Sequence, residues 1–280
     1  MARIVSLHLY PVKSCRGIDL DDATVGAAGL EAQGVGDREW MVVDAGGSFV
    51  TQREAPRMAL IVPAVEDGAL VLRAPGMAAV RIPLELPFGR QPGLGVRVWN
   101  HACRAFDEGD AVAEWLSGFL GRRLRLARFD PAHRRLSNRE RTGNVEAPNR
   151  FSDGYPILMI SEASLADLND RLQEAGREPL PMNRFRPNIV IGDVGPFDED
   201  RFVALRLGDA ALTPVKPCPR CPMPSIDQAT GTRGPDPLDV LARYRDDAQL
   251  GVVFGQNVIV TAGAGARLAR GQAFETEWNF

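Results

Sequence analysis

The strongest constraint on the fold is a run of short segments with strand-like composition, separated by turn residues. Residues 3–12, RIVSLHLYPV, alternate apolar and polar side chains with period two, as a half-buried strand does. Similar segments follow, some of them around the turn sequences AGG and EDG: residues 39–44 with 49–53, 59–65 with 69–74, and then 80–86 and 95–100. Such spacing predicts a small barrel or sandwich in the first part of the chain.

Helical periodicity is confined to a few segments. Residues 109–121 carry apolar side chains at helical spacing and end at a glycine. Residues 161–176 form the clearest predicted helix, with Ser161 as its N-cap and Gly176 as its stop. Further strands and one shorter helix complete the second part: strands within 188–192, 202–215 and 252–262, and a helix over 237–245. The predicted fold class is β-rich α+β, with a boundary near residue 125.

Composition excludes several functions. The chain has 280 residues, is 45% hydrophobic and 25% charged, and has a net charge of −3. Weak acidity argues against nucleic-acid binding, which depends on clustered positive charge. The N-terminal residues contain no apolar run long enough for a signal peptide or a membrane span, so we expect a cytoplasmic protein without a membrane anchor. Four scattered cysteines predict free thiols rather than a disulfide framework.

The sequence KPCPRC, residues 216–221, places Cys218 and Cys221 in a stiff segment. A closed zinc site needs four ligands, and the remaining Cys and His residues are poorly spaced to supply them. A redox pair lowers a thiol pKa partly at a helix N-terminus, but four prolines in the eight residues 217–224 disfavour a helix there. Burial as small apolar residues is the ordinary alternative. Another interpretation remains: one thiolate could be the protein's ligand to a metal whose other ligands come from a cofactor. Lys216 and Arg220 would favour the charged form of such a thiol.

Cationic and polar residues gather at predicted strand ends in several parts of the chain. Any one of them is more often a solvated surface residue, but together they suit a phosphate-bearing ligand, which arginine grips at two points. Asp153, in the sequence SDGYP, would accept hydrogen bonds from a heterocycle or cap a turn. The candidate anion-binding residues are Lys13, Ser14, Arg16, Arg38, Arg184, Arg186, Asn188 and Arg220.

These motifs occur in an order that resembles the MOSC-domain proteins. The similar segments are PVKS, GDR, TQR, SDGYPILMISEASLADLN, RFRPNIVI, CPRC followed by IDQATG, and FGQN, and they extend from about residue 3 to about residue 278. The sequence looks most like the amidoxime-reducing branch of that family. The resemblance implies an N-terminal β-barrel region at 1–125, packed against a MOSC β-barrel domain with a few helices at 126–280.

The resemblance also implies a molybdenum cofactor. By the family's motif, Cys221 would be the metal ligand and the catalytic centre. The cofactor-binding residues would be Lys13, Ser14, Arg38, Asp153, Arg186, Asn188 and Arg220, and Cys218 has no assigned role. Pyridoxal phosphate binding is a secondary expectation. The chain carries neither the iron–sulfur domain of some relatives nor a membrane anchor, so we expect a separate ferredoxin- or cytochrome-like electron donor.

Two functions follow from the resemblance. The first is a reductase of N-hydroxylated compounds such as amidoximes and hydroxylamino-bases. The second is a carrier of the cofactor or of sulfur without reductase activity. In either case the long polar stretch of residues 130–156 is a linker or a functional loop. We predict that this stretch, which carries Arg134, Arg135, Arg139 and Arg141 and ends in Asp153, forms one wall of a cofactor cleft.

Overall fold

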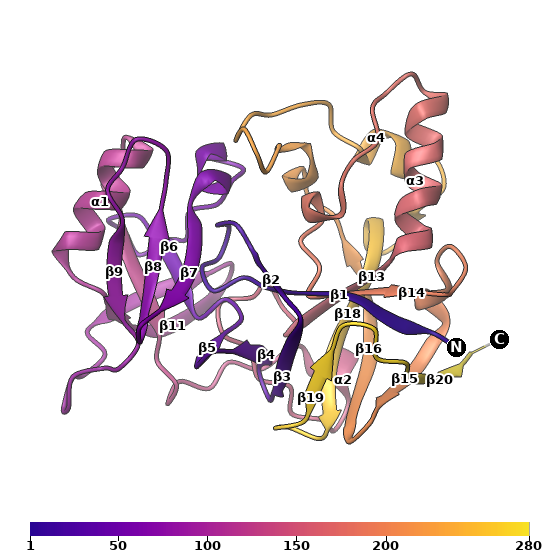
Figure 1. The fold of residues 1–280 in the computed structure, drawn as a ribbon, viewed down its shortest axis with the longest axis horizontal. Coiled ribbons are helices and arrows are strands. Elements are labelled where there is room, and N and C mark those ends of the chain that lie inside the picture. Colours follow the sequence, from indigo (N-terminus) through magenta and orange to yellow (C-terminus); the bar gives the residue numbers. More distant parts are fainter. Residues whose placement is uncertain (280) are drawn as a thin grey trace.

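The computed structural model describes residues 1–279, and its strands lie in four sheets (Figure 1). Two small sheets and a helix make up most of the first part of the chain. One sheet has the order β10–β11–β12–β6 and the other the order β7–β8–β9. Their strands are β6 (Trp40–Val43), β7 (Val62–Glu66), β8 (Ala69–Arg73), β9 (Val80–Pro83), β10 (Leu94–Val98), β11 (His101–Asp107) and β12 (Arg125–Phe129). Helix α1 (Asp110–Leu120) contacts β9 and β12.

A nine-stranded sheet dominates the second part. Its order is β2–β1–β14–β13–β18–β16–β15–β20, and β17 pairs with β18 outside this path. The strands are β1 (Arg3–Leu9), β2 (Ile18–Leu20), β13 (Ile157–Ser161), β14 (Ile189–Gly192), β15 (Phe202–Leu207), β16 (Ala210–Pro219), β17 (Asp246–Asp247), β18 (Gly251–Ala262) and β20 (Glu275–Trp278). Helices α3 (Glu162–Glu174) and α4 (Leu238–Leu241) contact each other and this sheet.

Strand pairing crosses the predicted boundary at residue 125. The first strand, β1, pairs with β14, so the indigo N-terminal segment runs among the orange strands in Figure 1. The fourth sheet, β19–β3–β4–β5, joins Arg267–Ala269 to three early strands, β3 (Asp22–Gly26), β4 (Gly29–Ala32) and β5 (Val35–Gly36). One apolar core includes Leu7 of β1, Trp40 of β6 and Val258 of β18. The two parts are therefore packed together, while the division at residue 125 stays a prediction.

The β-rich α+β prediction is confirmed, and so are several of its elements. Helix α3 begins after Ser161, whose hydroxyl accepts a hydrogen bond from the Ser164 backbone N–H, and Gly176 follows with a φ of 70°. The 59–65 and 69–74 segments form the expected hairpin of β7 and β8. Among the described residues, no helix is both apolar enough and long enough to cross a membrane.

Two local predictions hold only in part. The chain turns back after β6: Val43 bridges Phe49, and Val50 N donates to Val42 O and Asp44 N to Ser48 O, both at 2.9 Å. Residues 49–53 do not form the expected strand, however, and the sheet partner of β6 is β12. Burial explains the difference, because β6 is buried at all four positions and needs a partner on the sheet rather than a two-stranded ribbon. The helix expected over 237–245 is the single turn α4, Leu238–Leu241.

Candidate functional site

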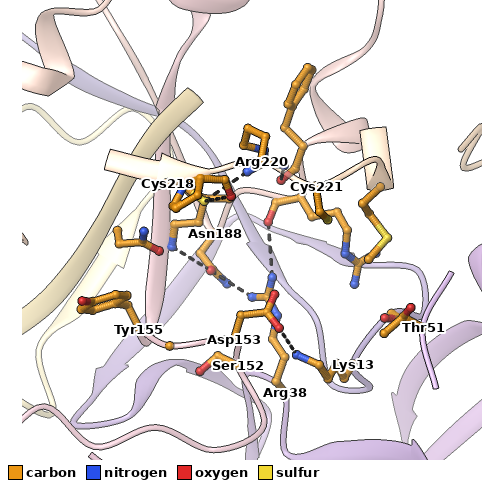
Figure 2. A pocket seen from close by; sticks show the side chains of 18 of the residues that line it. Lys13, Arg38, Thr51, Ser152, Asp153, Tyr155, Asn188, Cys218, Arg220 and Cys221 are labelled. Atoms are coloured by element: carbon orange, nitrogen blue, oxygen red, sulfur yellow. Dashed lines mark hydrogen bonds and ion pairs between the residues drawn. The ribbon is translucent and has the colours of Figure 1, made fainter. Parts of the chain in front are cut away.

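The eight residues proposed to bind or catalyse meet at one pocket between the two parts of the chain. All eight line this pocket, together with Cys218, Arg53 and ten further residues, none of which is basic. In Figure 2, Cys218, Arg220 and Cys221 lie on one side, and Lys13, Arg38 and Asp153 lie on the other. The eight are Lys13, Ser14, Arg38, Asp153, Arg186, Asn188, Arg220 and Cys221. Their roles toward a cofactor stay predictions.

The two cysteines stand at the end of strand β16. Pro217 and Pro219 pair with β18 on one side of this strand, whereas the pairing with β15 is confined to residues 210–212. Proline removes a ladder donor, so it is tolerated where one side of a strand has no partner. Arg220 N then donates to Val252 O at 2.8 Å, which secures the chain just before Cys221. Both thiols are half-buried. The segment is extended up to Pro219, as predicted, and a short 3-10 helix follows at Met223–Ser225.

Lys13 and Asp153 form an ion pair across the pocket. Lys13 Nζ donates to Asp153 Oδ1 at 2.7 Å and to Phe151 O at 2.8 Å. Burial lowers the pKa of Lys13, and the charge of Asp153 opposes that shift without cancelling it. Burial alone would raise the pKa of Asp153, but this effect is limited because the side chain is 71% exposed. The charge of Lys13 outweighs it and holds the pKa of Asp153 well below its usual range. Asp153 is therefore a carboxylate at neutral pH.

Asn188 and Arg38 tie the pocket floor to both parts of the chain. Arg38 Nη1 donates to Asn188 Oδ1 at 3.0 Å and to Asp37 Oδ2 at 2.5 Å. Asn188 Nδ2 in turn donates to Asp37 Oδ1 at 2.9 Å and to His8 O at 3.2 Å, and Leu158 N donates to Asn188 Oδ1 at 3.1 Å. Both ends of the Asn188 amide are thus used within the protein. This residue positions Arg38.

Arg186 is a buried cation without a hydrogen-bond partner at Nη2. It is 7% exposed, and its guanidinium lies 4.3 Å from the centroid of the Tyr10 ring. Arg38 lies at the same distance from that ring. Burial lowers the pKa of Arg186 to about 10; Tyr10 opposes the shift and Arg38 adds to it. The guanidinium remains charged at neutral pH, so an unpaired N–H in this position favours an anionic ligand.

Several residues of the pocket have a strained backbone. Ser14, Arg38, Trp99 and Arg186 all line the pocket and have φ between 49° and 65°. Side chains other than glycine rarely adopt this left-handed conformation, and each instance costs about 1–3 kcal/mol. Residues of this kind gather at sites where function requires a particular side-chain direction. Their concentration here supports the pocket as the functional site.

The electrostatics of Cys218 differ from the sequence-based expectation. Arg220 Nη1 lies 3.4 Å from Cys218 Sγ, and Arg220 Nη2 donates to Phe185 O at 3.0 Å. Burial nevertheless raises the pKa of Cys218, because desolvation of a thiolate outweighs the nearby charge. Arg220 does lower the pKa of Cys218, as expected for a flanking cation, but burial outweighs this effect and the net shift is upward. Lys216 does not line the pocket.

The 130–156 stretch is an ordered part of the site. Arg135 is 5% exposed, and its guanidinium donates to the backbone carbonyls of Arg150 (2.7 Å), Ser152 (2.7 Å) and Asp153 (3.0 Å). The residues that reach the pocket are 152–155. Of the four arginines named in this stretch, only Arg135 is buried. Arg134, Arg139 and Arg141 are exposed, and the first two pair with Glu146.

Two other proposed anion ligands lie elsewhere. Arg184 donates to Asp227 Oδ2 at 2.7 Å, outside the pocket. Arg16 borders a separate cavity of about 280 Å³, which Arg186 also lines.

Sequence reasoning missed several residues of the lining. Trp99 gave no signal, since an aromatic residue in a hairpin turn has no periodicity. Gln52 and Gln228, from the quoted TQR and IDQATG segments, form a buried reciprocal amide pair with distances of 3.0 and 2.8 Å. Gln52 Nε2 also donates to Ser14 O at 2.8 Å. This pair joins the two parts beside the pocket. The missed lining residues are Thr51, Arg53, Trp99, Ser152, Gly154, Tyr155, Leu158, Phe185, Pro219, Met223 and Asn257.

Comparison with known families defines the class of this protein. Residues 1–123 match the MOSC N-terminal beta barrel domain, and residues 146–274 match the MOSC domain. The two regions contribute Lys13 and Cys221, respectively, to the pocket.

Known relatives define the branch. The chain is 34% identical over 253 residues to mitochondrial amidoxime reducing component 2 of Bos taurus, with 86% of this chain and 72% of the relative covered. It is 34% identical over 247 residues to mitochondrial amidoxime-reducing component 1 of Homo sapiens, with the same coverage of each. For component 1 of Mus musculus the identity is 35%, with 86% and 71% covered. The chain belongs to the family of the mitochondrial amidoxime-reducing components.

Proposed function

We propose that this chain is a molybdenum-cofactor-dependent reductase of N-hydroxylated compounds. The reaction would convert an amidoxime or hydroxylamino group to the corresponding N–H compound and water, with two electrons and two protons consumed. Membership in a family whose named members reduce amidoximes supports the reaction type. The observation that carries the proposal is that buried, incompletely paired cations line the same pocket as the half-buried thiol of Cys221.

The residues present suit an anionic cofactor. Among the described residues, the lining holds five basic side chains and one carboxylate, Asp153. Two of the five, Arg186 at Nη2 and Arg220 at Nε, have buried N–H groups without a partner. A phosphate would satisfy these donors, and arginine is the residue best shaped to grip it. The five basic residues are Lys13, Arg38, Arg53, Arg186 and Arg220.

Cys221 suits a metal that brings most of its own ligands. No group of three or more His, Cys, Asp or Glu side chains gathers among residues 1–279 in a way that would hold a metal ion. Cys221 therefore offers a single soft sulfur, and the dithiolene sulfurs of a molybdenum cofactor would supply the rest. When bound, that group supplies oxygen-atom transfer coupled to two-electron redox chemistry.

The remaining side chains would bind and orient. Arg38 and Arg186 would hold the phosphate, with Asn188 and Asp37 positioning Arg38 through the hydrogen bonds described above. Asp153, ionised at neutral pH, would accept hydrogen bonds from heterocycle N–H groups. The 152–155 backbone, supported by Arg135, would close one wall against water.

Three further expectations belong to the same proposal. A separate ferredoxin- or cytochrome-like protein would deliver the electrons. A cytoplasmic location and pyridoxal phosphate binding stay predictions. Pyridoxal phosphate would compete for the same cations, because it too carries a phosphate.

A direct experiment separates the reductase from the carrier. The protein would be purified from a molybdenum-replete host, its metal content measured, and benzamidoxime reduction followed with a reduced artificial electron donor. We expect about one molybdenum per chain and formation of benzamidine. Stoichiometric molybdenum without reduction of any N-hydroxylated compound would favour the carrier. Absence of molybdenum would refute the reductase and the cofactor carrier and leave the sulfur carrier.

A further inference from the structure

Trp99 stands at the pocket in a costly conformation. It is the first residue of the two-residue loop that joins β10 to β11, and its φ is 52°. Loops of this length usually have glycine, asparagine or aspartate where φ is positive, because a bulky side chain there crowds its own backbone. An indole at this position therefore calls for a reason beyond the turn itself.

The ring is held by three neighbours. Its Nε1 donates to Asp153 Oδ1 at 2.9 Å, so it is joined to the ion pair with Lys13. The Arg53 guanidinium lies 4.8 Å from the ring centroid, and Phe49 meets the ring edge-on at 5.0 Å with an interplanar angle of 64°. A side chain restrained in this way loses little conformational freedom when a ligand contacts it.

Despite these contacts, much of the indole is open. Trp99 is 45% exposed, whereas Phe185, the other large apolar ring in the lining, is 1% exposed. Ligand pockets typically combine aromatic side chains with a few convergent polar groups, as this one does. The pocket thus combines a cationic interior with one rigid aromatic surface at its margin.

We infer that Trp99 is the specificity-determining residue that favours substrates whose N-hydroxylated group is attached to an aromatic ring. This inference rests on the proposed function and names the substrate class of the same pocket. An amidoxime conjugated to a ring is flat and would pack against the exposed indole, with a gain typical of aromatic pairs. An aliphatic amidoxime has the same reacting group and lacks that contact. Trp99 discriminates between them without taking part in the chemistry.

The test compares benzamidoxime with acetamidoxime for wild-type, Trp99→Gly, Trp99→Leu and Trp99→Phe holoenzymes, with an artificial electron donor and equal molybdenum content. We expect Trp99→Gly and Trp99→Leu to raise KM for benzamidoxime about five- to tenfold. The deciding quantity is the ratio of kcat/KM for benzamidoxime to kcat/KM for acetamidoxime, which should fall by the same factor, because a general disturbance of the pocket would lower both values equally. Trp99→Phe should restore most of the benzamidoxime affinity, because a ring remains although the N–H donor is lost.

Two controls keep the outcome decisive. Trp99→Gly relieves the positive φ, so it should fold even if Trp99→Leu does not. Phe88→Leu changes a fully exposed ring outside the pocket and should alter neither substrate. An equal effect of Trp99→Gly on both substrates, or no effect on either, would overturn the inference while leaving the proposed function intact.

A binding measurement decides the matter without turnover. Calorimetry with benzamidine and acetamidine, the two products, should show a preference for benzamidine in the wild-type holoprotein that Trp99→Gly reduces about five- to tenfold. If the wild-type protein reduced neither amidoxime, the proposed function would fail. The product preference would still show whether Trp99 selects aromatic ligands, and an unchanged preference in Trp99→Gly would show that it does not.

Discussion

Two walls of the pocket are held in place by different means. Residues 216–222 are stiff by their own covalent structure, with prolines at 217, 219 and 222 and pairing to β18. Residues 130–156 have no such stiffness. Their conformation depends on Arg135, which donates to three backbone carbonyls, and on Asn149, whose Nδ2 donates to Ser137 Oγ at 2.6 Å and to Gly154 O at 3.1 Å.

The comparison separates local from tertiary control of a binding wall. A proline-rich wall is already extended in the unfolded chain, so little conformational entropy is lost when it is ordered. A polar wall loses far more entropy, and a buried guanidinium must compensate for it. Mutations in the first wall should therefore change metal binding and catalysis, whereas mutations in the second should change the free energy of unfolding.

The largest expected effect is on the stiff wall. Cys221→Ser should abolish reduction of N-hydroxylated substrates and release most of the metal, because a serine oxygen is a poor substitute for a soft thiolate. Cys218→Ser should keep much of both, since its thiol lies against Arg220 and has a raised pKa. Metal analysis and turnover measure this directly. Equal loss in the two variants would instead favour a redox pair of the two thiols or a zinc site.

Next is the stability of the polar wall. Arg135→Ala should lower the free energy of unfolding by about 3 kcal/mol, because three backbone carbonyls lose a charged donor. Arg134→Ala is the matched control: the neighbouring arginine is 63% exposed, and its loss should change stability by less than about 0.5 kcal/mol. Urea titration gives both values. Similar effects would mean that the wall is not held by Arg135.

A third prediction concerns the cations that both walls face. Arg186→Ala and Lys13→Ala should each weaken cofactor retention by about 1.5–3 kcal/mol, since a buried phosphate would lose charge-assisted hydrogen bonds. Arg16→Ala, at the separate cavity, should leave retention unchanged. Molybdenum content after dialysis reports the difference. Full retention in Arg186→Ala would place that guanidinium outside the cofactor site.

The smallest effect should be on proteolysis of the polar wall. Trypsin can reach Arg134, Arg139 and Arg141, which are exposed, while the backbone around them is partly hydrogen-bonded. We expect cofactor to slow cleavage between residues 133 and 150 a few-fold by stabilising 152–155. The same digestion without cofactor is the reference. Rapid cleavage that ignores cofactor would make the stretch a linker.

Much of this could be predicted from local patterns. The N-cap at Ser161, the β7–β8 hairpin and the extended conformation up to Pro219 all depend on a few adjacent residues, and each was confirmed. The eight residues that meet at the pocket were predicted from the order of the family's motifs, since related proteins share their fold. The pairing of β6 with β12 and the role of Arg135 were not predictable, because each depends on a partner far away in the sequence.

The sequence by itself determined the strand-rich class, the main helices and the residue types available for an anionic, metal-bearing ligand. Periodicity, capping and proline chemistry act over a few residues, so they can be read along the chain. Only the tertiary structure decided which cations are buried and unpaired, as Arg186 is, and which are solvated, as Arg134 is. Burial and hydrogen-bond satisfaction depend on neighbours that only folding brings together. The same holds for Trp99, whose ring is fixed at the pocket by Asp153, Arg53 and Phe49, all distant from it in the sequence.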